Sequence, residues 1–574
     1  MKFRISLLLT TYLASATAFA ATEVNLRNQS YDYLQRQPSK VKIKKIRSRT
    51  DFNQIEHVRI QQTFNDIPVW NATGVVHIPS TKQTHALAPK AIAMNGMIYE
   101  GLEKDLASSN HALSFSASQK TKSLQLAQAT YSKKNNISNP KYKNEKSQPI
   151  IFVDDNKQAH YAYLSSFTYE STSAGVHRPT YIIDANNHHV YRTWDQVFTI
   201  SEEEAIKQAR ASIHFKLSND DDDLDLPDPS HPIKVGGIGG NEKTGPIIYD
   251  GDTGNRPGLD AKAMDINLDL DGAKISFTIC ALLNDDIAIL DASLDNTVVN
   301  SICASHSKAH NDVAWLNLSK DHTQWKEDEI NGAYSPSLDA FYAATMVKNM
   351  YQDWYGVPAL IDEDGQARQY IMRVHYGRGF DNAFWDGDVM TFGDGDKLFY
   401  PLTSLEVTAH EISHGFTQTH SNIDGFYPQM AALHESFSDM AAVSLDYYLN
   451  NTNRWEIGRD VWKNEGAMRY LDNPRKDGES IDHLKDFDNT EPHHGAGITN
   501  KAFYLIATTK GWNTRKAFDI MVKANMDYWT SSMSTLNEAA CGVIEATKDY
   551  HYNVADVRIA FAKVGINTDI CEVK

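Results

Sequence analysis

The spacing of apolar and polar positions divides the chain into three zones. From residue 21 to about 215, stretches rich in β-forming residues alternate with lysine-rich polar segments such as Lys133 to Lys146. Residues 240 to 400 again read as strands and loops with Gly-Asp turns, interrupted by one clear helix near Leu338 to Tyr355. From residue 403 onward the apolar positions recur at helical spacing. The pattern predicts an α+β fold in which a β-rich lobe is followed by an α-helical lobe.

The start of the helical zone carries a helix-start signal. Thr403 is followed three residues later by Glu406, which is the spacing of a capping box. The helix that begins there stands at the junction of the two predicted lobes. A cleft between lobes is a common place for a substrate to bind.

The first residues are typical of a secretory signal peptide. Lys2 and Arg4 precede an apolar run from Ile5 to Leu13, and small residues follow up to Ala20. This order of charged, apolar and small residues predicts cleavage after Ala20 and a secreted protein. The alternative, a membrane anchor, needs about 20 apolar residues, and this run is much shorter.

An acidic, proline-containing run separates the first zone from the rest. It extends from Ser218 to Pro229 and includes four consecutive aspartates. Such a segment cannot pack into a core and is expected to be an exposed linker. We therefore expect a signal peptide (1–20), a pro-region (21–217), a linker and cleavage zone (218–232), a β-rich catalytic lobe (233–408) and a helical catalytic lobe (409–574). The alternative is that the first 200 residues are a permanent binding domain.

Composition narrows the possible partners. A chain of 574 residues is too long for one core, and its formal charge of −17 argues against nucleic acid and anionic membranes, which both require a basic surface. We expect a monomer.

Four cysteines allow three pairings, of which the local one, Cys280–Cys303 with Cys541–Cys571, is the prediction. A cysteine zinc site is the alternative, but the chain has no C-x-x-C spacing.

The helical zone contains a pattern of metal ligands. His410 and His414 are four residues apart on one helix face, and Glu435 follows in a second segment rich in His and Glu. Two imidazoles and a carboxylate leave the fourth position of a zinc ion open, which is typical of a catalytic site. Glu411 lies beside this face and is predicted to act as general base on a zinc-activated water. Asp439, one turn after Glu435, is expected to hold the second ring nitrogen of a ligand histidine.

These segments resemble the thermolysin family of zinc metalloendopeptidases, in its vibriolysin/pseudolysin-like branch. The resemblance covers nearly the whole chain. It includes His410 to Thr417, Glu435 to Asp439, Val374 to Gly377, Asp381 to Gly387, Ala467 to Asp472 and Pro492 to Gly497. Residues of about 50–98 are similar to the fungalysin/thermolysin propeptide, and residues of about 120–197, ending at Trp194-Asp195, resemble a PepSY domain. The resemblance implies a two-lobed thermolysin-like metalloprotease preceded by an α+β propeptide.

The same resemblance implies roles for further residues. His493 is expected to stabilise the oxyanion, Glu491 to orient it, and Tyr427 to help bind the oxyanion. Arg469 is expected to bind a substrate carbonyl. Asn382 and the backbone of Ala383 are expected to bind the peptide as an added strand. Apolar residues are expected to line the pocket for the residue after the scissile bond, which predicts cleavage before bulky apolar side chains: Phe399, Leu402, Val407, Ile457, Val461 and Met468.

Two stretches depart from the family pattern. The segment between His414 and Glu435 is one residue longer than is usual, and His434 stands where the family has an asparagine. The positions that correspond to calcium ligands are Glu406, Val443, Asp446 and Arg454, of which two are not acidic. Since calcium requires several oxygen ligands, we expect Zn²⁺ without this Ca²⁺, with Arg454 forming a salt-bridge cluster in its place.

We therefore predict a secreted zinc endopeptidase that acts on proteins and peptides and is made with a pro-region that assists folding and inhibits the enzyme. One alternative is a secreted zinc-binding adhesin or pseudoenzyme that kept the fold without turnover. A second is an aminopeptidase that uses the same zinc motif.

Overall fold

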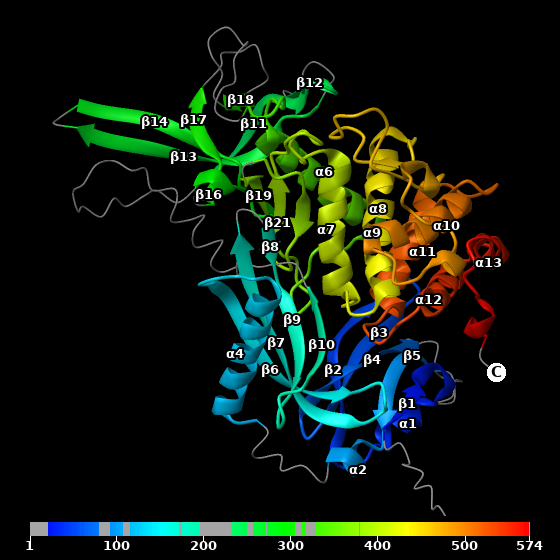
Figure 1. Cartoon of the computed structure of the whole chain (residues 1–574). Helices are drawn as coiled ribbons and strands as arrows, with labels where there is room; N and C mark the ends of the chain where they lie inside the picture. The colour runs from blue at the N-terminus through cyan, green and yellow to red at the C-terminus, as the bar shows by residue number, and fades with distance from the viewer. Residues whose placement is uncertain are drawn as a thin grey trace, which may run out of the picture.

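The computed structural model describes residues 21–79, 92–106, 115–171, 175–195, 231–249, 256–270, 273–294, 296–304, 313–316, 329–377 and 379–572. The expected signal peptide (1–20) and residues 218–230 of the expected linker lie outside these ranges. Figure 1 shows the pro-region in blue and cyan beneath the catalytic part, whose strands are green and whose helices run from yellow to red.

The pro-region is built on one sheet. Among the described residues, this sheet has ten strands in the order β1-β5-β4-β6-β7-β9-β10, with β3 joining β2 to β4 and β8 paired to β7. Helix α4 packs on β6 and β7 (Figure 1). The elements are β1 (Thr22–Asn25), η1 (Leu26–Asn28), α1 (Tyr31–Gln35), β2 (Val41–Thr50), β3 (Ile55–Phe64), β4 (Ile67–Pro79), β5 (Ala93–Glu100), α2 (Leu102–Leu106), α4 (Ala117–Lys134), β6 (Tyr142–Val153), β7 (Ala159–Ser171), β8 (Gly175–His177), β9 (Pro179–Asp184) and β10 (Val190–Asp195).

The β-rich lobe contains two further sheets within the described ranges. One has the order β12-β11-β13-β14-β17-β18, and the other has the order β16-β15-β19-β21-β20, so that β20 is an edge strand. The strands are β11 (His231–Asn241), β12 (Gly245–Tyr249), β13 (Leu259–Leu270), β14 (Ala273–Ala281), β15 (Ile287–Asp291), β16 (Thr297–Val298), β17 (Asn300–Ala304), β18 (Val313–Leu316), β19 (Tyr370–Tyr376), β20 (Ala383–Trp385) and β21 (Met390–Gly393), with the 3₁₀ turn η4 (Ala292–Leu294).

Helix α6 (Pro336–Tyr355) confirms the helix predicted in the β-rich lobe. Ser335 caps it by accepting from the backbone N–H of Leu338, and Pro336 fills the first turn, where its missing N–H has no consequence. Gly356 ends the helix in the left-handed region, at φ 65°. The helix packs on the lobe's sheets and on α7, which connects the two lobes.

Helices α7 (Leu405–His420) and α8 (Pro428–Asn450) form a hairpin at the junction of the lobes (Figure 1). The start of α7 corrects the predicted capping box. Ser404, not Thr403, accepts from the N–H of Val407, and the Glu406 carboxylate binds Arg454 instead of the backbone N–H of Thr403. The helix therefore begins one residue later than the spacing of Thr403 and Glu406 suggested.

The remaining helices complete the helical lobe, as predicted. The buried aromatic residues Phe416, Phe437, Phe503 and Trp529 lie in its core. The elements are β22 (Glu456–Ile457), β23 (Arg469–Tyr470), η5 (Pro474–Asp477), η6 (Leu484–Asp486), α9 (Pro492–Gly495), α10 (Gly497–Ala507), α11 (Thr514–Lys523), the π-helical turn η7 (Ala524–Tyr528), α12 (Leu536–Asp549), α13 (Val554–Lys563) and η8 (Asp569–Cys571).

One of the two predicted disulfides is confirmed. Cys541 of α12 is bonded to Cys571, which ties the C-terminal segment to the helical lobe. Cys280 of β14 also takes part in a disulfide. The side chain of its predicted partner, Cys303, lies outside the described residues, so that pairing stays a prediction.

The pro-region contacts the helical lobe through arginines of β2 and β3. Arg59 donates to the backbone carbonyls of Asn525, Met526 and Trp529, where the π-helical turn exposes them. Arg49 forms an ion pair with the buried Asp527 at 2.6 Å. These contacts satisfy carbonyl groups that the end of a helix leaves without a partner. The pro-region thus fits the helical lobe by both charge and hydrogen bonding.

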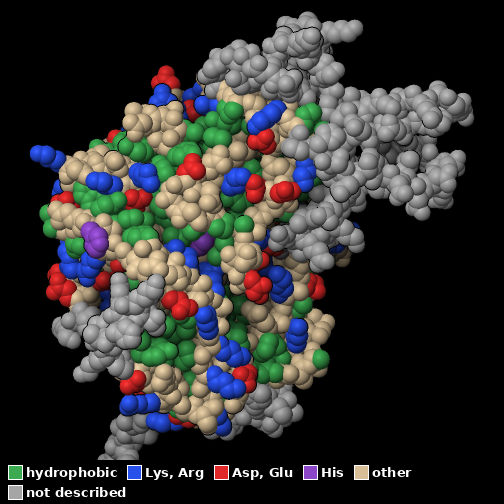
Figure 2. Space-filling model, turned by 180° about the vertical axis from the view of Figure 1, so that it is seen from behind, with side chains coloured by type: hydrophobic (Ala, Val, Ile, Leu, Met, Phe, Trp, Pro, Cys, Tyr) green, Lys and Arg blue, Asp and Glu red, His purple; other side chains and the backbone are tan. Residues whose placement is uncertain are grey.

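On the face shown in Figure 2, acidic and basic side chains are interspersed among apolar ones, and a histidine is visible in a hollow near the middle of that face. Among the described helices, none combines the length and apolar character needed to cross a bilayer.

Candidate metal centre and peptide cleft

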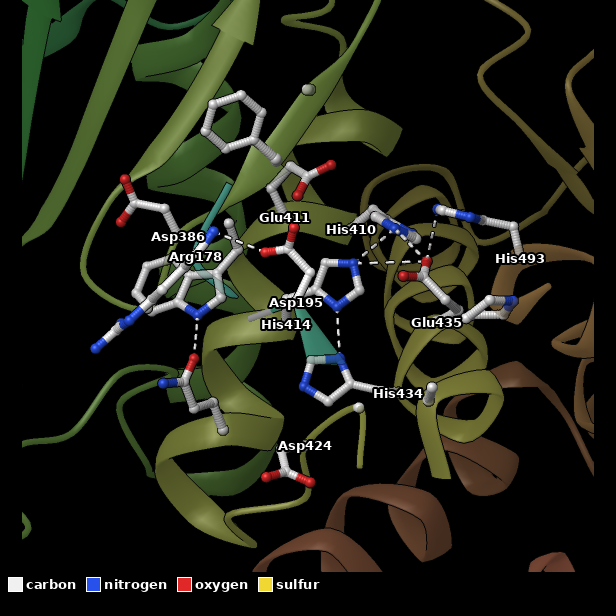
Figure 3. A pocket seen from close by; sticks show the side chains of 18 of the residues that line it. Arg178, Asp195, Asp386, His410, Glu411, His414, Asp424, His434, Glu435 and His493 are labelled. Atoms are coloured by element: carbon white, nitrogen blue, oxygen red, sulfur yellow. Dashed lines mark hydrogen bonds and ion pairs between the residues drawn. The ribbon is translucent and has the colours of Figure 1, made fainter. Parts of the chain in front are cut away.

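Two histidines of α7 and a glutamate of α8 converge on one point. The Nε2 atoms of His410 and His414 are 2.9 Å apart. Oε2 of Glu435 lies 3.2 Å from the first and 3.6 Å from the second. One helix supplies both rings because residues four apart share a face, and the hairpin brings the carboxylate of α8 opposite them (Figure 3). The three side chains therefore lie together, as predicted from the sequence.

The triangle of donor atoms fits a zinc ion. Zinc binds imidazole and carboxylate at about 2.0–2.2 Å, so two ligands of a tetrahedral ion stand about 3.3 Å apart. The three separations here are 2.9, 3.2 and 3.6 Å. Burial lowers the pKa of His414 well below its ordinary value, whereas against burial Asp439 and Glu435 raise that of His410 to about 10; a metal ion bound there would release that proton. Both the residue types and their spacing are therefore suited to a metal.

His410 is backed by a buried carboxylate. Its Nδ1 lies 2.9 Å from Oδ1 of Asp439, as predicted from the helical spacing. Arg469 binds both oxygens of Asp439, at 2.6 and 3.0 Å, and Asn500 donates to it at 2.8 Å. Burial would raise the pKa of Asp439, but Arg469 and His410 outweigh it and hold that pKa well below its ordinary value. Asp439 is therefore an anion that fixes which nitrogen of His410 carries the proton.

Arg469 lies in the cleft wall as well as on Asp439. The resemblance assigns it to a substrate carbonyl. In this structure its Nε and one terminal nitrogen are directed to Asp439, so the guanidinium is held rigidly at the edge of the site.

Glu411 is buried and lines the same cleft (Figure 3). Burial raises its pKa to about 7, and the negative charge of Glu435 acts in the same direction, while His410 opposes the shift. A carboxyl group with a pKa near neutrality can both accept and return a proton.

His493 and Glu491 come together next to the metal centre. Nδ1 of His493 is 2.6 Å from Oε1 of Glu491, and its Nε2 is 3.2 Å from Oε2 of Glu435. The negative charge of Glu435 raises the pKa of His493, and Glu491 adds to this against the effect of burial. The neighbouring His494 instead turns to Glu479, at 3.0 Å.

A cleft of about 830 Å³ opens beside these groups. Asn382 and Ala383, at the edge strand β20, line it together with Leu402, Val407, Ile457 and Met468, which were all expected there. The other two expected pocket residues are not among the lining residues. Phe399 packs against Trp462 at 4.9 Å and Val461 is buried, so both support the wall from behind.

The structure does not bring Tyr427 to the metal centre. Tyr427 is the residue before α8 and is not among those that line the cleft. The preceding Phe426 packs against Trp70 and Trp194 of the pro-region, at 6.1 and 5.2 Å between ring centroids. The Tyr427 hydroxyl interacts with the Asn71 side chain, also of the pro-region. These contacts hold the end of the α7–α8 loop toward the pro-region.

The sequence did not reveal that the pro-region forms one wall of the cleft. Its contribution consists of Trp70, Gln148, Leu164, His177, Arg178 and Asp195. Asp195, at the end of β10, accepts from the backbone N–H of Arg178 at 2.7 Å and pairs with His177 at 2.7 Å. Figure 3 shows Asp195 beside Glu411 in projection, with Arg178 extending away from the metal ligands. No spacing rule connects these residues to ligands more than 200 positions later in the chain.

The Arg454 guanidinium lies among carboxylates that include two of the residues expected at the calcium position, Glu406 and Asp446. It binds Glu406 at 2.5 Å and Asp460 at 2.8 and 3.0 Å, while its Nε lies 3.9 Å from Asp446. Burial raises the pKa of Glu406 to about 7, and the negative charge of Asp460 adds to this, while Arg454 lowers it. Asp460 was not foreseen as a partner of Arg454.

Comparisons with known proteins agree with this geometry. A family model described as the thermolysin metallopeptidase catalytic domain matches residues 274–418, and its alpha-helical domain matches residues 425–566. The fungalysin/thermolysin propeptide motif matches residues 42–84.

Several relatives align over almost the entire chain. The zinc metalloproteinase MspA of Legionella longbeachae is 36% identical over 91% of this chain and 88% of its own length. The zinc metalloproteinase of Legionella pneumophila is 35% identical over 92% of this chain and 88% of its own. The neutral protease of Vibrio proteolyticus is 32% identical over 97% of this chain and 80% of its own.

Proposed function

Because the chain belongs to the thermolysin family of metallopeptidases and is a zinc-dependent endopeptidase made with a propeptide, we propose a specific role for each group of the site. The observation that carries the proposal is the triangle of His410, His414 and Glu435 with Glu411 in the wall of the adjoining cleft. These three residues hold one catalytic Zn²⁺ per chain.

Glu411 is the general base. When bound, the zinc ion acts as a Lewis acid that polarises the scissile carbonyl and lowers the pKa of an attacking water. Glu411 takes a proton from this water as its oxygen adds to the carbonyl carbon. It then gives the proton to the leaving nitrogen when the C–N bond breaks. The buried position that raises the pKa of Glu411 to about 7 suits both steps.

His493 stabilises the negative charge that develops on the carbonyl oxygen. Glu491 accepts from its Nδ1–H, and the raised pKa of His493 favours the charged ring, whose Nε2–H then points toward the metal centre. Arg469 contributes positive charge from the opposite edge while it is held by Asp439. Tyr427 is a further oxyanion donor only in a form of the enzyme in which its loop has left the pro-region.

The peptide substrate binds as an additional strand along β20. This strand is the edge of its sheet, and an edge strand offers unpaired backbone groups to an extended chain. Asn382 and Ala383 lie at the start of β20. The apolar side chains of Leu402, Val407, Ile457 and Met468 accept a bulky apolar residue just after the scissile bond.

The pro-region inhibits the enzyme by occupying the cleft. Trp70, Arg178 and Asp195 form part of its wall, across from Asn382 and Ala383, which are expected to bind an extended chain. Residues 21–217 form this pro-region and assist folding, and it is removed by cleavage within residues 218–232 of the linker. The protein is secreted by its N-terminal signal peptide and acts as a monomer, without nucleic acid or membrane as partner.

Calcium is not bound between α7 and α8. The Arg454 guanidinium supplies the positive charge that Glu406 and Asp460 require, and Val443 offers no oxygen ligand.

Casein cleavage by the processed protein tests the activity. The expected result is cleavage that stops when zinc is chelated and returns when zinc is restored. Glu411→Gln is expected to lower kcat by roughly 10²–10⁴-fold, because a general base is lost. Glu545→Gln, on α12 and outside the cleft, is the matched control and should keep full activity.

Two outcomes contradict the proposal. A folded, processed, zinc-loaded protein that cleaves neither casein nor blocked peptides is a binding protein. Cleavage restricted to peptides with a free N-terminus is the mark of an aminopeptidase. Digestion of internally quenched peptides, blocked at both ends, separates the second outcome from endopeptidase activity.

A further inference from the structure

His434 contacts a metal-ligand histidine directly. It lies in the second turn of α8, and its Nδ1 is 2.6 Å from Nδ1 of His414. The ring centroids are 4.8 Å apart and the ring planes differ by only 18°, so the two rings meet almost edge to edge through their Nδ1 atoms (Figure 3). This geometry is that of a direct hydrogen bond between two imidazoles.

The metal centre determines which ring donates. A histidine ligates a metal through a nitrogen that carries no proton, and the Nε2 of His414 faces His410 and Glu435. The proton of a neutral His414 therefore resides on Nδ1 and is donated to His434. Nδ1 of His434 must accept, which leaves the proton of a neutral His434 on its Nε2.

The two ligand histidines are thus supported differently. His410 donates to the Asp439 carboxylate, which Arg469 and Asn500 hold in turn. His414 donates to an uncharged ring. An acceptor of this kind fixes the orientation and tautomer of His414 without adding a second negative charge behind the ligands.

The side of the His434 ring that faces away from His414 lines the cleft. His434 is among the lining residues, beside Asp424 and Ala431. Figure 3 shows its second nitrogen directed away from His414, toward the Asp424 side of the cleft. With a proton on it, that nitrogen is a hydrogen-bond donor on the wall of the cleft.

We propose that His434 is a positioning residue with two functions: its Nδ1 fixes His414 for zinc, and its Nε2–H donates to the peptide in the cleft. This inference rests on the proposed zinc endopeptidase function. It assigns the two functions to different atoms of one side chain, and substitutions can therefore separate them.

Two amide side chains test the two nitrogens separately. In His434→Asn the amide oxygen takes the place of Nδ1, and no group reaches the position of Nε2. In His434→Gln the amide nitrogen reaches the position of Nε2, and the acceptor beside His414 is lost. His434→Leu removes both polar atoms. All three are made in the full chain that also carries Glu411→Gln, so that self-digestion does not alter the samples.

Zinc affinity is measured by competition with a chromophoric chelator. His434→Gln and His434→Leu are expected to weaken zinc binding by about 10–100-fold, the usual effect of losing a partner of a ligand histidine. His434→Asn should stay within about threefold of the parent, because the acceptor is retained. Nitrogen-15 NMR of the histidine rings provides a second readout: the Nδ1 proton of His414 should persist in His434→Asn and exchange faster in His434→Leu.

The donor function is measured in the processed proteins with Glu411 intact. His434→Asn, loaded with zinc, is expected to lower kcat/KM for a long peptide by about 3–10-fold, as for loss of one neutral hydrogen bond. If His434→Leu binds zinc as tightly as the parent, the positioning function is overturned. If His434→Asn cleaves the peptide as well as the parent, the donor function is overturned. A parent protein that binds no zinc contradicts the proposed function itself, so the two failures are distinguishable.

Discussion

Two clusters of histidine and carboxylate in this molecule have nearly the same composition but different occupants. His410, His414 and Glu435 form one, and Asp51, His57 and Asp527 form the other; in each, the nearest side-chain atoms lie within 4.8 Å of one another. The first borders an open cleft. The second is buried between the pro-region and the helical lobe and contains an ammonium group of the chain itself.

That ammonium group belongs to Lys523, at the end of α11. It lies 2.5 Å from Asp51 and 3.0 Å from Asp527, and its side chain is 1% exposed. Arg49 adds a second positive charge. The chain therefore supplies the cation that its carboxylates require. Around the metal centre the guanidinium of Arg469 binds Asp439, and the cation-forming side chain that faces Glu435 is His493 in the cleft wall. The local balance of charge, more than the ligand types, distinguishes a metal site from an ion pair.

One histidine of each cluster is joined through Nδ1 to a second imidazole outside it, and the surroundings of the two pairs differ. His414 and His434 need only one proton each, as two neutral rings. In the interface, His57 Nδ1 is 2.7 Å from His77 Nδ1, His57 Nε2 lies 3.1 Å from the Asp51 carboxylate, and His77 Nε2 lies 2.6 Å from the Asn95 amide oxygen. Burial lowers the pKa of His77 to about 3, so this ring stays neutral. Lys523 and Arg49 supply the positive charges beside Asp51 and Asp527.

The largest expected effect on stability comes from replacing Lys523, whose ammonium group is the cation of the buried cluster. Lys523→Met in the full chain, with Glu411→Gln to prevent processing, leaves two buried aspartates with one positive partner fewer. Breaking such a pair on one side typically costs about 3–5 kcal/mol of unfolding free energy. Denaturant unfolding measures the loss, and zinc content should stay unchanged because the metal centre is a separate cluster.

Lys548→Met is the matched control for this variant. Lys548 is exposed and pairs with Glu545 on the surface of α12. Its loss is expected to change stability by less than about 0.5 kcal/mol. An equal effect of the two substitutions contradicts the claim that Lys523 neutralises the cluster. Binding of a second zinc ion by Lys523→Met sharpens the comparison, because it shows that only the lysine excludes a metal from that position.

Acid is expected to weaken the same interface. The Lys523 and His57 contacts lower the pKa of Asp51 against the effect of burial, and Arg49 and Lys523 do the same for Asp527, so both pKa values lie well below their ordinary range. A depressed carboxyl pKa adds stability above the unfolded value of about 4, and this stability is lost as the pH falls below it. With two such groups, the unfolding free energy of the full-length Glu411→Gln protein should fall by up to about 2.7 kcal/mol per pH unit in that range.

Asp527→Asn identifies the source of this slope. It is expected to be less stable at neutral pH and to show a shallower decline between about pH 4 and pH 2, since one fewer carboxyl takes up a proton. Unfolding curves recorded at each pH provide the comparison. Parallel declines in the two proteins exclude Asp527 as a contributor.

The contrast between the clusters also shows what could be predicted from sequence. The i, i+4 spacing of His410 and His414 follows from helix geometry alone, and the structure places both as expected. Their separation from Lys523 or Asp51 follows from no local rule, because these contacts join segments hundreds of residues apart. For the same reason the pro-region wall of the cleft could not be predicted.

Short-range rules also failed where tertiary contacts competed with them. Glu406 has the spacing of a capping residue, but Arg454 draws its carboxylate away, and Ser404 becomes the cap. Tyr427 is near the metal ligands in sequence, but the packing of Phe426 against pro-region tryptophans turns this segment away. In both cases a long-range partner outweighs the local pattern.

The smallest expected effect concerns Arg454, where the chain again supplies a cation to carboxylates. Arg454→Gln should lower the unfolding free energy by about 1–2 kcal/mol, less than Lys523→Met, for two reasons. Arg454 is 39% exposed, so water replaces part of its interaction. The pKa of Glu406 is already raised to about 7 by burial, so without Arg454 this carboxyl takes up a proton at neutral pH and no longer carries a buried charge.

The control is Arg459→Gln, because Arg459 is exposed and pairs with Glu456; this substitution should change stability by less than about 0.5 kcal/mol. A loss for Arg454→Gln as large as that for Lys523→Met contradicts this account, because it means that Glu406 stays charged. Stabilisation of Arg454→Gln by added calcium, absent in the parent, shows that the arginine and a divalent ion compete for one position.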